Sequence, residues 1–206
     1  MWIVYFLCPH GYFIFLETLL THLNGVISRR PQAMDLFGSY GVETAWRLGD
    51  WSSLSQFLRI SSEPKFEVML GEVFFTAKFK NEFDFNNAIN KARDSLIGSL
   101  CAASMESYRE AYGYVYKLHI LSEIEDFARN VHFSNEKTSL TQILRDWDVR
   151  LGFTSPTFEV RDLILTVRRL LLENFRFSIL WAWFFIFLVS ANTRSHSIYL
   201  NHDNWN

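Results

Sequence analysis

The hydrophobic positions of this chain recur at helical spacing through most of its length. The apolar residues between positions 35 and 48 fit one helix, because apolar side chains three and four residues apart share a helix face. Gly49 and Asp50 then supply a turn, and either Asp50 or Ser52 can cap a second helix by accepting hydrogen bonds from its free N–H groups. The apolar positions of that second helix are Trp51, Leu54, Phe57 and Leu58. Two short helices joined by a tight turn predict a helical hairpin.

The same spacing predicts three further helices. One covers 66–79, after Pro64 breaks the chain, and another covers 83–100. A longer helix is expected over roughly 103–131, where the apolar residues form two stripes. One stripe is Tyr108, Tyr112, Val115 and His119, and the other is Tyr116, Ile120, Ile124 and Phe127. A helix with two apolar stripes has to be covered on two sides.

The last predicted helix has a clear start. Ser155 is expected as its N-cap and Pro156 at its first position, where a missing N–H costs nothing. Its main apolar stripe is Val160, Leu163, Ile164, Val167, Leu170 and Leu171. No sustained alternation of apolar and polar residues competes for a strand. We therefore expect an all-α fold, a helical-repeat solenoid over 16–174.

Both ends of the chain differ from this helical middle. Residues 1–15 form an apolar segment without the basic start and cleavage site of a signal peptide, and Pro9-His10-Gly11 interrupts it. Residues 175–206 contain a second apolar run, 177–191, and then a polar tail. The 15 residues of this run fall short of the roughly 20 that span a bilayer. A buried helix, a tail anchor and non-native sequence from a wrong exon boundary remain alternatives for it.

Charge and cysteine content narrow the function classes. Twenty Lys and Arg against 22 Asp and Glu give a net charge of -2, without the basic excess of a domain that neutralises many phosphates. Direct nucleic-acid binding is therefore not expected. Cys8 and Cys101 are the two cysteines, and the chain has no Asn-x-Ser/Thr acceptor site. This composition favours a reducing intracellular setting.

No catalytic, cofactor-binding or metal-binding residue is predicted. The chain lacks the Gly-rich loop, the P-loop and the catalytic Asp motifs of kinases, and its His and Cys residues are scattered. His119 could act as an acid or base, but its Tyr-rich apolar stripe favours a core histidine. Cys101 lies between Leu100 and Ala102, so we expect an inert buried thiol.

Two residue groups could instead bind a partner. Arg161, Arg168 and Arg169, with Arg145 and Arg150 upstream, could meet an acidic partner. The acidic residues between them favour an ordinary solvated face.

Trp46 and Trp51 could anchor a partner, since exposed aromatic side chains dominate many interfaces. At their positions on either side of the predicted turn, we expect them to lock the two helices of the hairpin together.

The run from Tyr40 to Trp51 resembles the tetratricopeptide-like helical hairpin of the FAT region in phosphatidylinositol-3-kinase-related protein kinases. Its distinctive core, interpreted as a structural repeat motif, is Ala45, Trp46, Leu48, Gly49 and Trp51. Further runs are similar, in matching order, to the ATR branch of this family, the DNA-damage checkpoint kinases. They are 23–26, 70–72, 100–108, 112–119, 121–125, 147–151 and 163–171.

This resemblance implies a fold like tetratricopeptide and HEAT repeats, and a non-catalytic piece of a large nuclear Ser/Thr protein kinase of DNA-damage signalling and repair. The FAT region of such a kinase supports and regulates its kinase domain. That parent domain uses ATP with Mg or Mn, whereas no cofactor is expected in this chain. The implied partners are the parent's kinase domain and the ATR-interacting protein.

The resemblance stops near 16 and 174, so a fragmentary gene model is expected. Two alternatives remain. One is a stand-alone helical-repeat adaptor that binds other proteins, and the other is an adaptor of this kind that is also anchored in a membrane through 177–191. A slice of a solenoid exposes apolar faces that neighbouring repeats would cover, which predicts poor solubility.

Overall fold

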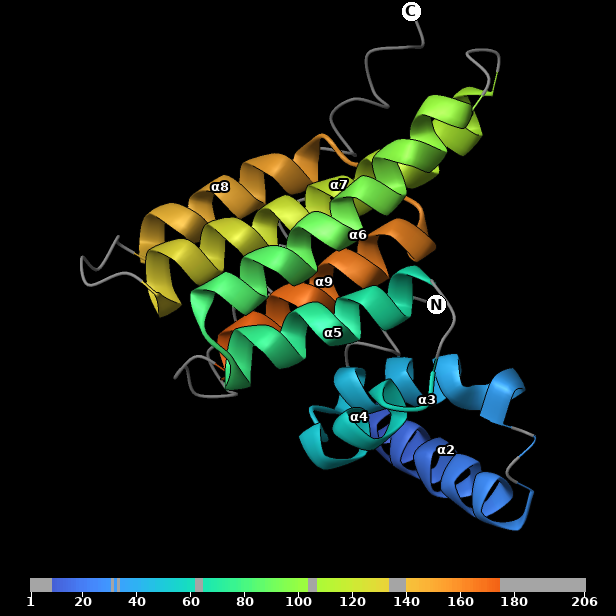
Figure 1. Cartoon of the computed structure of the whole chain (residues 1–206). Coiled ribbons are helices and arrows are strands. Elements are labelled where there is room, and N and C mark those ends of the chain that lie inside the picture. The colour runs from blue at the N-terminus through green and yellow to red at the C-terminus, as the bar shows by residue number, and fades with distance from the viewer. Residues whose placement is uncertain are drawn as a thin grey trace, which may run out of the picture. The chain divides into compact units, whose positions relative to one another are not determined.

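A computed structural model describes residues 9–30, 32, 34–61, 65–103, 107–133 and 140–174 (Figure 1). Within these ranges every regular element is a helix, which confirms the all-α prediction. The elements are α2 (Pro9–Arg29), α3 (Met34–Leu48), α4 (Trp51–Leu58), α5 (Phe66–Phe79), α6 (Glu82–Ala102), α7 (Tyr108–Phe127), the π-helix η2 (Ala128–His132), α8 (Leu140–Gly152) and α9 (Phe158–Asn174). They belong to two compact units, Met1–Ala102 and Ala103–Asn206.

In the first unit, neighbours in sequence are also neighbours in space. Helix α2 packs on α3, α3 on α4, α4 on α5 and α5 on α6, and α5 also packs on α3. The buried stripe of α2 is Leu16, Leu20, Leu23 and Ile27. Consecutive buried residues from Val68 to Leu70 show that α5 is covered on several sides. Helix α5 is therefore the centre of this unit.

Helix α2 differs from the sequence prediction at its start. It begins at Pro9 and continues through Gly11, so the three residues that interrupt the apolar run in the sequence, Pro9-His10-Gly11, form the first turn of the helix. Proline fits the first turn of a helix, because the N–H that it lacks has no partner there in any case. The predicted segment boundary between 15 and 16 falls inside this helix.

In the second unit, α7 is shorter than expected and less covered. It begins at Tyr108, because the backbone of Ser107 is not helical, and its α-helical part ends at Phe127. The stripe that includes Ile120, Ile124 and Phe127 is buried. On the other stripe Tyr108 is 79% exposed and Val115 48% exposed, so the expectation of cover on two sides is wrong at these positions.

Helix α9 begins three residues after the predicted cap. It starts at Phe158, where the N–H of Arg161 donates to the carbonyl oxygen of Thr157. The N–H of Ser155 donates to the hydroxyl of Tyr112 on α7 at 2.7 Å, so this segment is held against α7 before the helix begins. Helix α9 packs on α7, and every residue from Leu163 to Leu172 is buried.

The apolar runs at the two ends are largely beyond the described residues. Residues 1–8 and the whole of 177–191 lie outside them, so the alternatives for 177–191 stay predictions. Among the helices that the structure describes, none combines the length and the apolar composition needed to cross a membrane.

Candidate interaction and structural sites

The turn between α3 and α4 is built by two consecutive residues. Gly49 has a φ of 74°, a conformation that glycine adopts without the steric cost of a side chain. Its N–H donates to the carbonyl oxygen of Trp46 at 3.1 Å, and the N–H of Asp50 donates to that of Ala45 at 3.0 Å. This pair of bonds is the Schellman arrangement that satisfies the last carbonyl groups of a helix.

Asp50 also starts the next helix. One of its carboxylate oxygens accepts hydrogen bonds from the N–H groups of Ser52 and Ser53, both at 3.1 Å, and the two serine hydroxyls bond the same carboxylate. Partial burial raises the pKa of Asp50, but these hydrogen bonds outweigh it, and the pKa lies below its ordinary value of 3.8. Of the two predicted caps, Asp50 is the cap of α4, and Ser52 is one of its donors.

The two tryptophans of the predicted repeat motif contact α5. Trp46 is fully buried, and its ring centroid lies 5.5 Å from that of Phe74. Trp51 is half-buried, lies edge-on to Phe79 at 6.0 Å and has the ammonium of Lys78 4.2 Å from its ring centroid. We predicted that the two tryptophans hold α3 and α4 together. In the structure both side chains also contact α5, and they attach the hairpin to that helix.

Two glycines let these helices approach closely. A β-carbon on Gly41 of α3 would overlap the ring of Phe57 on α4. A β-carbon on Gly71 of α5 would lie 2.6 Å from Val42 and 3.2 Å from Leu54. The other two positions of the motif lie in the same packed region, with Ala45 fully buried and Leu48 half-buried.

The second unit has a buried charged cluster. The carboxylate of Glu123 on α7 is 0% exposed and accepts two hydrogen bonds from the guanidinium of Arg168 on α9, at 2.8 and 2.5 Å. His119 Nε2 lies 2.9 Å from the same carboxylate. The guanidinium carbon of Arg168 also lies 5.3 Å from the ring centroid of Trp147 on α8, so one buried arginine joins three helices.

The balance of forces keeps Glu123 ionised. Burial raises its pKa, but the hydrogen bonds from Arg168 and His119, together with their charges, outweigh burial and hold the pKa below the ordinary value of 4.5. The side chain of His119 is 25% exposed, so it lies only partly in the core that was predicted for it, and its Nε2 contacts a buried carboxylate.

The arginine prediction is wrong for two of the three arginines of α9, whereas Arg161 is half-buried. Arg168 is 3% exposed and Arg169 4% exposed, so they form neither a basic patch nor a solvated face. Arg169 binds Glu173 one turn later, at 2.7 Å. The spacing of charges on α9 is typical of a solvated face, but Arg168 and Arg169 each have an acidic partner, Glu123 and Glu173, which lets them be buried.

Cys101 is exposed, which contradicts the expected buried thiol. The buried stripe of α6 ends with Leu96. A position five residues later lies about 140° around the helix from it, since an α-helix has 3.6 residues per turn. The apolar neighbours in sequence were therefore a poor guide to burial.

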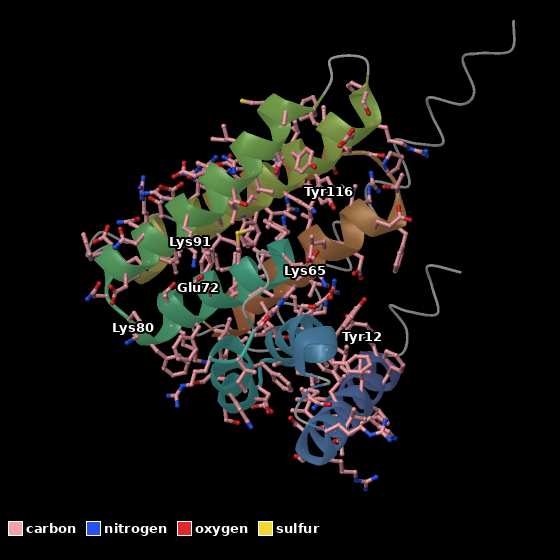
Figure 2. All side chains as sticks on the ribbon, turned by 45° about the vertical axis from the view of Figure 1, so that its right-hand side comes forward. Tyr12, Lys65, Glu72, Lys80, Lys91 and Tyr116 are labelled. Carbon is pink, nitrogen blue, oxygen red and sulfur yellow. The ribbon has the colours of Figure 1, made fainter. Side chains whose placement is uncertain are left out.

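A groove on the first unit was missed by the sequence analysis. It has a volume of about 870 Å³, and we call it the α5 groove. Its lining is Ser55, Leu58, Arg59, Ser61, Val68, Met69, Glu72, Phe75, Thr76, Phe79, Lys80, Lys91 and Ser95. Figure 2 shows Glu72 of α5 beside Lys91 of α6, with Lys80 near the end of α5. The described residues contain no group of three or more His, Cys, Asp or Glu placed to hold a metal ion.

Comparison with known proteins gives a consistent result. The FAT domain family model matches residues 38–183. The chain is 30% identical over 173 residues to the Serine/threonine-protein kinase ATR of Arabidopsis thaliana, and 31% identical over 173 residues to that of Oryza sativa subsp. indica, each match covering 75% of this chain. It is also 30% identical over 154 residues to the Serine/threonine-protein kinase tor1 of Schizosaccharomyces pombe, which covers 71% of this chain.

These matches concern a small part of each relative. The chain spans 6% of the length of each of these three kinases. The family model that matches is that of the FAT domain and not that of a kinase domain. No solved structure matches the chain.

Proposed function

We propose that this chain, which belongs to the FAT domain family, is a non-catalytic helical scaffold segment of an ATR-like Ser/Thr protein kinase. In the parent protein it would support and regulate the kinase domain in DNA-damage signalling, in the nucleus. The observation that carries this proposal is the similarity to ATR kinases, which extends over 173 aligned residues and covers 75% of this chain. The similarity to the tor1 kinase is shorter, at 154 residues, which favours the ATR branch.

The packing of the first unit supports a scaffold role. A scaffold has to pass a displacement from one helix to the next without losing it in loose contacts. Helices α3, α4 and α5 meet at buried tryptophan, phenylalanine and glycine positions. Close-packed interiors of this kind are stiff and transmit strain.

The partners are part of the same proposal. By its similarity to ATR kinases, the segment would contact the kinase domain of its own parent chain, and the assembled parent would bind the ATR-interacting protein. ATP with Mg or Mn would be used by the parent's kinase domain, and this segment would bind neither.

The test of identity is the full-length transcript. Sequencing it across both ends of this chain should reveal a downstream kinase region with the phosphate-binding lysine and the magnesium-binding aspartate that phosphoryl transfer requires. A transcript that ends without such a region would instead support the stand-alone helical-repeat adaptor.

A second measurement tests the non-catalytic role. The purified 206-residue chain should show a strongly helical circular dichroism spectrum and transfer no phosphate from ATP to a protein substrate with either magnesium or manganese. Phosphate transfer that copurifies with the chain and disappears on its immunodepletion would refute a pure scaffold.

A further inference from the structure

The α5 groove has an apolar floor that follows one helix. Its α5 residues include Val68, Glu72, Phe75 and Phe79, whose spacing places them on one face. The distance along the helix from Val68 to Phe79 is about 16 Å at 1.5 Å per residue. A ligand that fills the groove along this axis is therefore extended, with a length of about three helical turns.

The two sides of the groove come from different helices. Leu58 and Arg59 lie at the end of α4, and Lys91 lies on α6. Lys91 Nζ is 2.9 Å from a carboxylate oxygen of Glu72, and this pair crosses from α6 to α5 with both side chains largely accessible, at 66% and 41%. The groove is thus a channel between three helices, and the ion pair lies on its rim.

Charge distinguishes the groove from the rest of the chain. Its charged lining residues are Arg59, Lys80, Lys91 and Glu72, three cations and one anion. The whole chain has a net charge of -2, so the groove is a basic region on an acidic protein. Complementary charge attracts an acidic partner and repels a basic one.

The apolar floor of the α5 groove favours a ligand that has apolar groups as well as acidic ones. Phe79 is 52% exposed although its ring contacts Phe75 and Trp51, and half-exposed aromatic side chains are typical anchors of protein interfaces. Small-molecule sites bury most of their ligand in a concave apolar pocket, whereas this channel has accessible cationic side chains along its rim. The combination favours a helix laid into the groove with its apolar face down.

We propose that the α5 groove binds an acidic amphipathic helix of a partner protein, about three turns long, with large apolar side chains on one face and Asp or Glu on its flanks. The apolar face packs on Leu58, Phe75 and Phe79. The acidic flanks lie against Arg59 and Lys80, while Lys91 neutralises Glu72 on the rim. This inference goes beyond the scaffold role, because it concerns the first unit alone and needs no kinase.

The probe is a fluorescein-labelled synthetic helix with Leu at i, i+3, i+4 and i+7 and Glu elsewhere, added to the full 206-residue chain. Fluorescence anisotropy should show saturable binding that weakens as salt rises from about 0.05 M to about 0.5 M, because rim charges are screened over this range. A peptide with Lys in place of each Glu should not bind, and neither should a Glu-rich peptide without the leucines.

Two variants locate the binding site. Arg59→Glu with Lys80→Glu should weaken binding of the acidic peptide roughly tenfold, a change of about 1.4 kcal/mol. Phe79→Ala should weaken it as well through the loss of the apolar anchor. The matched control, Arg29→Glu with Arg145→Glu, changes the net charge equally at exposed positions outside the groove and should leave the affinity unchanged. Circular dichroism checks that every variant keeps its helices.

The outcomes that overturn the proposal are specific. Equal binding of acidic and basic peptides, an equal effect of the control pair, or no binding at all would each refute it. Tighter binding of a single-stranded oligonucleotide than of the acidic helix would assign the rim cations to phosphate. Self-association that Phe79→Ala abolishes, with no peptide binding, would make a second copy of this chain the occupant.

Discussion

The contact of α3 and α4 with α5 and the contact of α7 with α9 join helices by different means. The first is apolar, and it depends on glycines that bring backbones together and on Trp46 against Phe74. The second contains a buried ion pair between Glu123 and Arg168. A fully buried tryptophan lies at each contact, Trp46 of α3 at the first and Trp147 of the neighbouring helix α8 at the second, and a guanidinium carbon lies 5.2 or 5.3 Å from each ring centroid. The two contacts therefore share a buried aromatic ring, and they differ in what joins the helices. Glycines allow close packing in the first, and a buried ion pair connects the helices in the second.

This difference predicts how each contact fails. An apolar contact loses stability gradually as side-chain volume changes, since neighbouring residues partly relax. A buried ion pair fails sharply when one partner is removed, because the remaining charge has no solvent and no counter-charge. The second unit should therefore be the more sensitive of the two to single substitutions at its contact.

The largest effect is expected from Arg168→Met. The buried Glu123 carboxylate then keeps only its hydrogen bond to His119, and the free energy of unfolding should fall by about 3–5 kcal/mol. Hydrogen exchange followed by mass spectrometry should show the loss in peptides from α7 and α9. The double variant Arg168→Met with Glu123→Leu is the control, and it should recover most of the loss because no charge remains buried. Equal losses in both variants would mean that packing and not charge holds this contact.

A smaller effect is expected from Gly71→Ala. The new methyl group meets Val42 at 2.6 Å and Leu54 at 3.2 Å, and overpacking of this kind costs about 1–3 kcal/mol. Urea denaturation followed by circular dichroism measures it. Gly25→Ala is the matched control, because a β-carbon there has no atom within 4 Å, and it should stabilise α2 by about 0.5–1 kcal/mol. If both variants are stabilised, the close approach of α5 does not limit the packing.

Asp50→Ala should cost about 1 kcal/mol, the usual value of an N-cap hydrogen bond. The N–H groups of Ser52 and Ser53 lose their acceptor, so hydrogen exchange should accelerate first in α4. Asp50→Asn keeps a side-chain acceptor and should cost much less. Comparable exchange rates in the two variants would show that charge, and not the hydrogen bond, is what matters at this turn.

The smallest effect is expected from mild acid. Because the pKa of Glu123 is lowered from 4.5, its contribution to stability is complete above pH 4.5 and is lost as the pH falls through the lower folded-state pKa. The difference between the urea midpoints of the wild-type chain and of Glu123→Gln should therefore not shrink between pH 7 and pH 5, and the two midpoints should converge below pH 4.5. A difference that shrinks already between pH 7 and pH 5 would contradict a lowered pKa.

The features that could be predicted from the sequence have local causes. Two examples are the bounds of α5 and the turn at Gly49 and Asp50. Residues within one helical turn of each boundary determine them, so the local sequence is enough to predict them. The family assignment could also be predicted, because the similarity to ATR kinases covers 75% of the chain.

The features that were missed depend on residues far apart in the sequence. Arg168 and Glu123 are 45 positions apart, and the spacing of charges on α9 is the same whether an arginine faces water or a buried carboxylate. The α5 groove combines side chains from three helices, between Ser55 and Ser95, none of which is unusual in its own helix. The exposure of Cys101 is different, because it follows from the apolar stripe of α6 that ends with Leu96 and not from the apolar residues on either side of the cysteine.

The turn between α3 and α4 has no spare residue. Gly49 supplies the reversed backbone, and Asp50 both closes one helix and opens the next. An inserted residue would separate these two roles, so the hairpin should tolerate substitutions in this turn far better than any change in its length. Relatives of this chain should accordingly vary in loop length elsewhere, and a label or affinity tag is better inserted beside the exposed Phe153 than at this junction.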